Sequence, residues 1–274
     1  MSNFNLMNKN KLIKVIKMLA GLIQYPSKKS LSNIVFNNYF KKLDKEIFHE
    51  DISIPPELFD NYIPDILKKY TYLNVTIPFK TKILNYINIS DEAHNLNAVN
   101  CIYKNCGYNT DYLGIINSLK NVVIDSPILI LGAGGVAKAF LYALTNLKIK
   151  KVFVSNRTLK NAIDLKKRFD SFLDIEIIPY ENIHKYLSNF KTFINCTSIG
   201  MCGENFDFEL NLINNVSLIY DSVYSKTLLQ TFAYINNISI INGEKLWYYQ
   251  AIENLKIWNL YNEEIFEISY NERF

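Results

Sequence analysis

Residues 128–139 read ILILGAGGVAKA: a short apolar run, closely spaced glycines, and then a helix-forming segment. Gly132, Gly134 and Ala137 have the G-x-G-x-x-A spacing of a turn that joins a buried strand to a helix and holds a dinucleotide. The first glycine permits the tight turn, the second lets the backbone approach a pyrophosphate at the helix N-terminus, and the alanine allows close packing. The alternative is a glycine turn in an α/β unit that binds no ligand. We therefore expect an α/β chain with a dinucleotide-binding unit.

The segment that follows indicates which dinucleotide is bound. An NAD site requires an acidic residue about 20 residues beyond the glycines, where it bonds the ribose 2′-hydroxyl. Here the next predicted strand ends in Asn156-Arg157-Thr158, with Lys160 close behind and no acid. A guanidinium can hold a 2′-phosphate through two hydrogen bonds, and this chain has only three arginines, at positions 157, 168 and 273. The pattern favours NADP over NAD; the alternative is an ordinary surface arginine.

Predicted strands and helices alternate outward from this unit in both directions. Before it, strands are expected at 19–25, 47–54 and 73–79, and helices at 30–43 and 55–70. After it, strands are expected near 150–156, 175–180, 192–198, 217–224 and 238–241, and one long amphipathic helix at 245–264 closes the chain. This βαβ rhythm predicts an α/β fold with mostly parallel sheets and a domain seam near 109–114.

Composition argues against several other classes of protein. The net charge of the 274 residues is only +4 and the lysines are scattered, so no nucleic-acid partner is expected. No run of 18 apolar residues occurs, so no membrane span is expected. Cysteines 101, 106, 196 and 202 have no CxxC or zinc spacing, so we expect free thiols, a cytoplasmic location and no metal. Residues 1–24 are basic and then apolar, which favours a short strand over an export signal because lysines interrupt the apolar part.

Two polar segments contain candidate catalytic residues. NVTIPFK (74–80) ends in Lys80, and NAVNCIYKNCGYNTDYLG (97–114) places Asn100 and Asp111 near strand ends. A lysine positioned by an aspartate can give a proton to a carbonyl that is being reduced. An ordinary Lys–Asp salt bridge is the alternative, and spacing alone favours it.

Seven motifs, NVTIPFK, GYNTDYLG, GAGGVAK, SNRT, NCTSIGM, DSVY and GEKLWYYQA, occur in this order. Together they resemble the shikimate dehydrogenase family over residues 19–258. The resemblance implies NADPH-dependent reduction of 3-dehydroshikimate to shikimate in aromatic amino-acid biosynthesis. It also implies an N-terminal α/β substrate domain (1–111, completed by 246–274), an NADP-binding Rossmann domain (112–245), a C-terminal helix that packs back on the first domain, and a monomer or homodimer.

The resemblance assigns roles to individual residues. Lys80 matches the catalytic lysine and Asp111 the aspartate that pairs with it. Asn100 and Gln250 match groups that bind the substrate, and its carboxylate would be held by Ser30, Ser32, Thr76 and Tyr224. The implied cofactor positions are Gly132, Ala133, Gly134, Gly135, Val136, Ala137, Asn156, Arg157, Thr158, Lys160, Thr197, Met201 and Gly243.

The chain departs from the family pattern in several places. The segment around the two serines, residues 29–37, lacks the two histidines and the proline that usually surround them. Cys101, Tyr112, Ser225 and Leu246 also replace more usual residues. Two alternative functions follow: a quinate/shikimate dehydrogenase that uses NAD as well, and a non-catalytic homologue that binds shikimate-like ligands or NADP.

Overall fold

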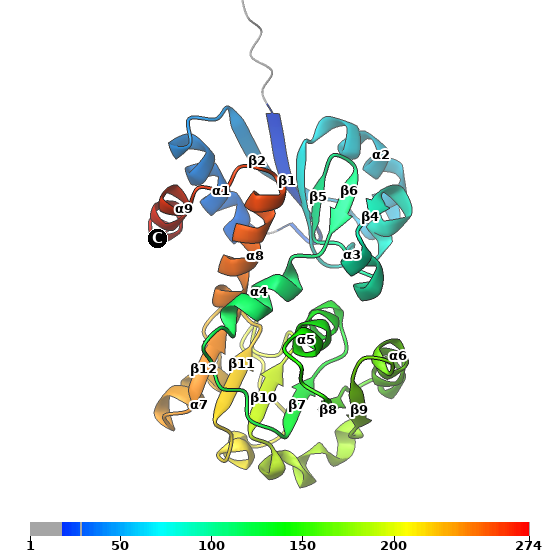
Figure 1. Cartoon of the computed structure of the whole chain (residues 1–274), viewed down its shortest axis with the longest axis vertical. Coiled ribbons are helices and arrows are strands. Elements are labelled where there is room, and N and C mark those ends of the chain that lie inside the picture. Colours follow the sequence, from blue (N-terminus) through cyan, green and yellow to red (C-terminus); the bar gives the residue numbers. More distant parts are fainter. Residues whose placement is uncertain (1–17, 28, 274) are drawn as a thin grey trace, which may run out of the picture.

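The computed structural model describes residues 18–27 and 29–273, which form two α/β halves stacked end to end (Figure 1). The question of a strand or an export signal at the start of the chain concerns mainly residues 1–17, which lie outside the described residues. Each half is built on a six-stranded sheet. The α/β prediction is confirmed.

The first sheet has the strand order β2-β1-β3-β5-β6-β4. β1, β2 and β3 run parallel, whereas β5 is antiparallel to both β3 and β6, so this sheet is mixed. The strands are β1 Met18–Gln24, β2 Ile47–Ser53, β3 Tyr72–Val75, β4 Asn88–Ile89, β5 Cys101–Tyr103 and β6 Cys106–Tyr108. The helices of this half are α1 Leu31–Lys42, α2 Phe59–Lys69 and α3 Asp91–Leu96, with short 3₁₀ turns at Pro56–Leu58 and Lys82–Tyr86.

The second sheet is parallel throughout, with the order β12-β11-β10-β7-β8-β9. The strands are β7 Ile128–Leu131, β8 Lys151–Ser155, β9 Asp174–Ile177, β10 Thr192–Asn195, β11 Leu218–Asp221 and β12 Ser239–Asn242. The helices are α5 Gly135–Asn146, α6 Leu159–Phe169 and α7 Leu228–Ile235, with 3₁₀ turns at Tyr180–Lys185, Leu187–Asn189 and Leu210–Ile213. The strand order reverses between β7 and β10, which is the Rossmann arrangement, and ligands bind at such a point beyond the carboxyl ends of the strands.

Two helices join the halves: α4 (Asp111–Ser118) and α8 (Gly243–Ile257) pack side by side at the waist of the molecule (Figure 1). The expected domain boundaries, 111/112 and 245/246, fall inside these two helices. α8 then runs back to the first sheet, where Trp247, Ala251 and Trp258 share a core with Phe36 and Tyr39 of α1. The predicted return of the C-terminal helix to the first half is therefore confirmed.

The prediction of one closing helix at 245–264 is wrong. α8 ends at Ile257, and a separate helix, α9, spans Glu263–Asn271. Asn259 between them has a left-handed backbone, with φ 57°, and Asn262 caps α9 by accepting from the backbone N–H of Ile265. A left-handed residue cannot continue a right-handed helix, and asparagine tolerates it well.

Other boundaries also differ from expectation. The strand predicted at 73–79 ends at Val75, because Pro78 has no N–H to donate and the N–H of Phe79 turns back to the carbonyl of Thr76. The helix predicted at 55–70 is a 3₁₀ turn followed by α2. β5 and β6 were not predicted; their hairpin turns at Lys104 and Asn105, both with positive φ.

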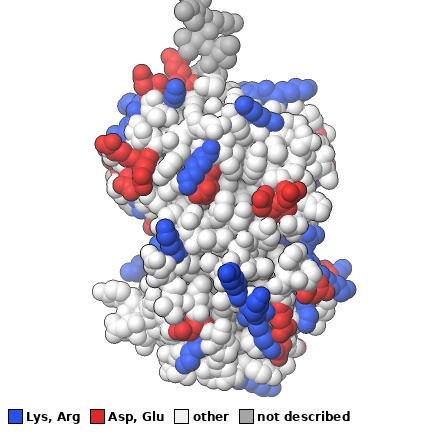
Figure 2. Space-filling view, viewed as in Figure 1, with Lys and Arg blue, Asp and Glu red and all other residues white. Residues whose placement is uncertain are grey.

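Among the described residues, no helix is long and apolar enough to cross a membrane. On the face shown in Figure 2, acidic and basic side chains are scattered over both halves and form no continuous basic area.

Candidate active site

A cavity of about 270 Å³ lies between the two halves and is lined by residues from both. All eight residues predicted to act in catalysis or substrate binding line it: Ser30, Ser32, Thr76, Lys80, Asn100, Asp111, Tyr224 and Gln250. They come from the start of α1, the turn after β3, the residue before β5, the first turn of α4, the loop after β11, and α8. The fold therefore gathers groups that are up to 220 residues apart in the sequence, from Ser30 to Gln250, around one space.

Lys80 and Asp111 form an ion pair at the wall of this cavity. Lys80 Nζ donates to Asp111 Oδ2 at 2.6 Å, and the two side chains are 17% and 12% exposed. The backbone carbonyl of Lys80 is held by the N–H of Val99 at 2.8 Å, which fixes the turn that carries it. Asp111 begins α4, where the helix dipole favours a negative charge. The pair is thus positioned from both sides and remains partly open to the cavity.

The second oxygen of Asp111 is held by a network of buried amides. Asn100 Nδ2 donates to Asp111 Oδ1 at 2.8 Å, and Asn100 Oδ1 accepts from the N–H of Thr110 at 2.7 Å. Gln250 Oε1 accepts from Asn254 Nδ2 at 3.1 Å and from Asn100 Nδ2 at 3.4 Å. Because its oxygen is turned toward these partners, the amide nitrogen of Gln250 is left for a ligand in the cavity.

Four hydroxyl-bearing residues, Ser30, Ser32, Thr76 and Tyr224, also line the cavity. Ser32 Oγ accepts from Trp247 Nε1 at 3.2 Å, and Ser30 caps α1 by accepting from the N–H of Asn33 at 3.0 Å. Burial of its hydroxyl and the nearby charge of Asp111 raise the pKa of Tyr224 above its ordinary value, although 51% of the residue's surface is exposed. Tyr224 is therefore protonated at neutral pH and can donate a hydrogen bond, as can Thr76.

Several residues that line the cavity were not predicted from the sequence: Leu22, Gln24, Lys29, Leu31, Asn74, Val75 and Trp247. Asn74 is the most informative, because it is only 5% exposed. Its Nδ2 donates to the carbonyl of Asn100 at 3.1 Å, while its Oδ1 has no hydrogen-bond partner among the described residues. A buried acceptor without a partner is unusual, and this one belongs to a residue that lines the cavity. The signal was present in NVTIPFK, where a polar residue stands in a fully buried strand.

The glycine turn lies at the carboxyl end of β7. Gly132 has φ +109°, and a Cβ there would stand 3.0 Å from the backbone of Cys196, so glycine is required. Gly134 caps α5 and Gly135 begins it, and a Cβ at either position would meet no atom within 4 Å. The N-terminus of α5 therefore faces open space beside Ala133 and Val136, as a bound pyrophosphate requires.

The adjacent strand end carries the predicted 2′-phosphate residues. Asn156 Nδ2 donates to the carbonyl of Thr158 at 2.9 Å and shapes the loop after β8, from which Arg157 and Lys160 are exposed. Arg168 donates to the carbonyl of Asn95 at 3.1 Å and Arg273 pairs with Glu244. Among the described arginines, Arg157 alone makes no hydrogen bond or ion pair, so it is available to an anion.

The remaining predicted cofactor positions lie close to the glycine turn or to the cavity: a Cβ at Gly132 would stand 3.1 Å from Thr197, and one at Gly243 would stand 2.6 Å from Tyr224, which lines the cavity. Thr197, after β10, donates to Asn195 Oδ1 at 2.6 Å. Met201 is 44% exposed and lines the substrate cavity itself. Gly243 has no room for a side chain, because a Cβ would stand 2.2 Å from the carbonyl oxygen of Ser222. These residues connect the predicted dinucleotide site with the cavity that holds Lys80.

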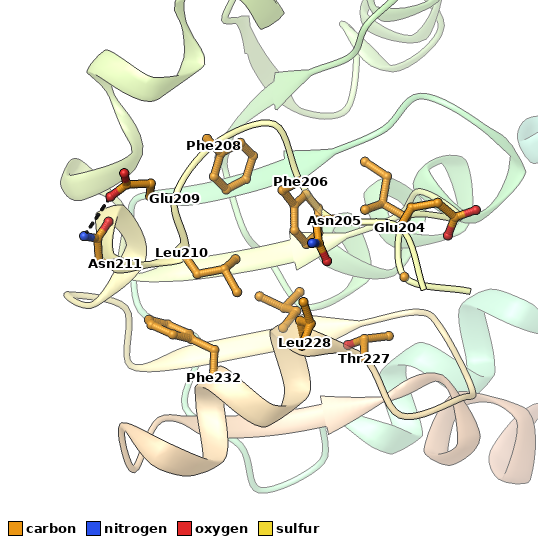
Figure 3. Close-up of a pocket in the computed structure, with 13 residues that line it drawn as sticks. Glu204, Asn205, Phe206, Phe208, Glu209, Leu210, Asn211, Thr227, Leu228 and Phe232 are labelled. Carbon is orange, nitrogen blue, oxygen red and sulfur yellow. Dashed lines mark hydrogen bonds between the residues drawn. The ribbon is translucent and has the colours of Figure 1, made fainter. Parts of the chain in front are cut away.

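A larger cavity, of about 480 Å³, lies elsewhere in the second half, between the loop after β10 and α7 (Figure 3). Phe206, Phe208 and Leu210 on the loop and Leu228 and Phe232 on α7 make it mainly apolar (Figure 3). Its acidic residues, Glu204 and Glu209, have no basic partner among its lining. It therefore lacks the paired acid and base that the smaller cavity contains.

Comparison with known proteins agrees with this geometry. Residues 22–102 match the shikimate dehydrogenase substrate binding domain, and residues 116–201 match the shikimate / quinate 5-dehydrogenase model. A protein of Thermotoga maritima named shikimate dehydrogenase (NADP(+)) is 37% identical over 252 residues, which cover 92% of this chain and 97% of that protein.

Solved structures of related proteins have the same fold over nearly the whole chain. The crystal structure of shikimate dehydrogenase from Thermotoga maritima has a TM-score of 0.87 at 36% identity, covering 93% of this chain and 99% of that one. The structure of the Aquifex aeolicus shikimate dehydrogenase has a TM-score of 0.84 at 29% identity, covering 95% of this chain and all of that one.

Proposed function

The chain belongs to the shikimate dehydrogenase family, and we propose that it catalyses the reversible, NADPH-dependent reduction of 3-dehydroshikimate to shikimate. It is an NADP-dependent oxidoreductase of the shikimate pathway. The observation that carries the proposal is the Lys80–Asp111 ion pair, 2.6 Å long, in a cavity that Met201 and Tyr224 of the Rossmann unit also line. Lys80 is thus a proton donor in a cavity that the dinucleotide-binding half also lines, and that half would hold the hydride donor.

Lys80 is the proton-transfer group in this proposal. Bound NADPH supplies the hydride that reaches the keto carbon of the substrate. Lys80 Nζ gives a proton to the oxygen of that carbonyl as negative charge develops on it, and Asp111 holds the ammonium in place. In the oxidation of shikimate, Lys80 accepts the hydroxyl proton. Because Asp111 Oδ1 is bound to Asn100, the carboxylate keeps its orientation throughout.

The polar groups around the pair position the substrate. We assign the ring hydroxyls to Asn100, Asp111 and Gln250, and we add Asn74, which lines the cavity and whose Oδ1 has no hydrogen-bond partner in the described part of the chain. We assign the substrate carboxylate to the part of the cavity wall that carries the hydroxyls of Ser30, Ser32, Thr76 and Tyr224. Separate sets of groups for the ring hydroxyls and the carboxylate give the substrate a single orientation.

The cofactor is NADP. We propose that α5 and Gly132–Val136 hold the pyrophosphate, with Ala137 packed beneath, and that Arg157 with Asn156, Thr158 and Lys160 holds the 2′-phosphate. Thr197, Met201 and Gly243 would contact the nicotinamide side.

Several broader features belong to the same proposal. Residues 1–111 with 246–274 would form the substrate domain and 112–245 the NADP domain, in accord with the two sheets. We propose a cytoplasmic enzyme, monomeric or homodimeric, that acts on a small molecule. Size-exclusion chromatography with light scattering distinguishes the two oligomeric states.

A steady-state assay tests the function directly. Purified protein should reduce NADP⁺ with shikimate, at a higher kcat/KM than with quinate or with NAD⁺. Comparable rates with NAD⁺ and quinate would instead favour the quinate/shikimate alternative. Binding of shikimate without turnover would favour the alternative of a non-catalytic homologue. The intact Lys80–Asp111 ion pair argues against that alternative.

A further inference from the structure

Ser30 and Ser32 both line the substrate cavity, but their hydroxyls differ in what they can still donate. A serine hydroxyl has one proton and two lone pairs. Ser32 Oγ accepts from Trp247 Nε1, so its proton remains available to the cavity. Ser30 Oγ accepts from the N–H of Asn33 at 3.0 Å and gives its proton to Asp51 Oδ1 at 2.5 Å. The proton of Ser30 is therefore already bound.

Asp51 is held in this position by the backbone as well. It lies on β2, opposite Leu22 of β1, and Leu22 itself lines the cavity. Its second oxygen, Oδ2, accepts from the N–H of Ser30 at 3.1 Å. The two oxygens of the Asp51 carboxylate thus accept hydrogen bonds from the backbone N–H and the hydroxyl of Ser30, which itself lines the cavity. A short hydrogen bond to an ionised acceptor is among the strong ones, so the hydroxyl does not rotate away freely.

We propose that Asp51 is a positioning residue that weakens binding of the substrate carboxylate by holding the Ser30 hydroxyl proton. This inference rests on the proposed function, because it concerns the part of the cavity wall assigned to the shikimate carboxylate. With its proton turned to Asp51, Ser30 presents a lone pair to the cavity, and a carboxylate also offers only lone pairs. The negative charge of Asp51 adds repulsion. Ser32, Thr76 and Tyr224 then provide the donors.

Replacing one oxygen of Asp51 by nitrogen reverses the hydrogen bond at Ser30. In Asp51→Asn, the remaining side-chain oxygen can still accept from the N–H of Ser30, while the new amide nitrogen donates to Ser30 Oγ. Both lone pairs of Ser30 Oγ are then occupied, and its proton is free for the substrate. We expect KM and Kd for shikimate to fall about tenfold, the factor of one charge-assisted hydrogen bond. kcat should stay within about twofold, because the gain applies to ground and transition states alike.

The methyl ester of shikimate provides a matched substrate control. Its carboxyl group carries no charge, so Asp51→Asn should change its KM much less than that of shikimate. Equal improvement for the ester and the acid would overturn the proposal, because it would show a general change in the cavity. Absence of any turnover by the wild-type protein would instead refute the proposed function, which keeps the two failures distinct.

A double-variant cycle tests the part played by Ser30. Ser30→Ala should raise KM for shikimate by a larger factor in the Asp51→Asn background than in the wild-type background, because only there is the hydroxyl free. Ser32→Ala, the matched control, should raise KM by the same factor in both. If the improvement from Asp51→Asn survives without the Ser30 hydroxyl, charge removal alone explains it and the proposal fails.

One measurement does not depend on the folding of Asp51→Asn. In the otherwise wild-type chain, calorimetric titration of shikimate should show a larger rise in Kd for Ser32→Ala than for Ser30→Ala. An equal or reversed order would contradict the proposal.

Discussion

Gly114 of α4 lies directly against Gln250 of α8: a Cβ at position 114 would stand 3.0 Å from both the Cβ and the backbone nitrogen of Gln250. It would also stand 2.9 Å from the carbonyl oxygen of Leu246. This contact sets the distance between the two helices that join the halves, and Gln250 lines the substrate cavity. Packing at the waist is thus coupled to the position of a substrate-binding group.

Gly114→Ala should therefore destabilise the protein and weaken substrate binding together. The backbone of α8 must move by a few tenths of an ångström, and overpacking of this kind costs about 1–3 kcal/mol. Chemical denaturation measures the loss, and steady-state kinetics should show a raised KM for shikimate. Gly135→Ala is the control for stability, since that position opens on empty space. Equal stability of the two variants would contradict the packing argument.

Lys80→Ala should abolish most of the activity without unfolding the chain. A positioned proton-transfer group contributes about 10²- to 10⁴-fold to the rate, so kcat should fall by a factor in that range. Asp111→Asn should also lower kcat, because the ammonium loses its charged partner. Lys82→Ala is the matched control: this lysine pairs with Asp60 on the exposed surface, away from the cavity. A wild-type kcat in Lys80→Ala would refute the role assigned to this residue.

Arg157→Ala should weaken NADP⁺ selectively. Loss of a charge-assisted hydrogen bond to the 2′-phosphate should raise the Kd for NADP⁺ about tenfold or more and leave that for NAD⁺ nearly unchanged. Fluorescence titration with both dinucleotides measures the two values independently of turnover. Lys167→Ala, on the exposed part of α6, controls for general loss of positive charge. Equal weakening of both dinucleotides would place Arg157 outside the 2′-phosphate site.

The features that the sequence predicted well are those that local chemistry determines. β7 is a run of four apolar residues that hydrophobic clusters bury on both faces of a parallel sheet, and Gly132 needs a backbone that only glycine adopts easily. The motifs around Lys80 and Asp111 named residues that the structure places on one cavity, although spacing alone favoured a plain salt bridge. The 2.6 Å distance between Lys80 Nζ and Asp111 Oδ2 could not be predicted, because it depends on how the turn after β3 is placed relative to α4.

The features that the sequence missed depend on contacts between distant segments or on single residues. Trp247 reaches the cavity only because α8 packs on α1, and its bond to Ser32 spans 215 positions. The break between α8 and α9 depends on the left-handed backbone of Asn259, which helical periodicity does not reveal. The hold of Asp51 on Ser30 requires β2 to lie beside the start of α1. Side-chain patterns predict elements, whereas these relations follow from tertiary packing.

His49 should make the protein sensitive to acid. Its ring is fully buried against Phe36 with neither nitrogen hydrogen-bonded among the described residues, and burial lowers its pKa from 6.5 to about 3. Below pH 6.5 the unfolded chain therefore binds a proton at His49 that the folded chain does not, and stability falls as the pH drops toward 3. This one group should contribute a slope of about 1.4 kcal/mol per pH unit in that window. Denaturation of His49→Leu at pH 7, 6, 5 and 4 should show a shallower loss than wild type. His94→Leu, at an exposed position, should keep the wild-type slope, and an unchanged slope in His49→Leu would refute the assignment.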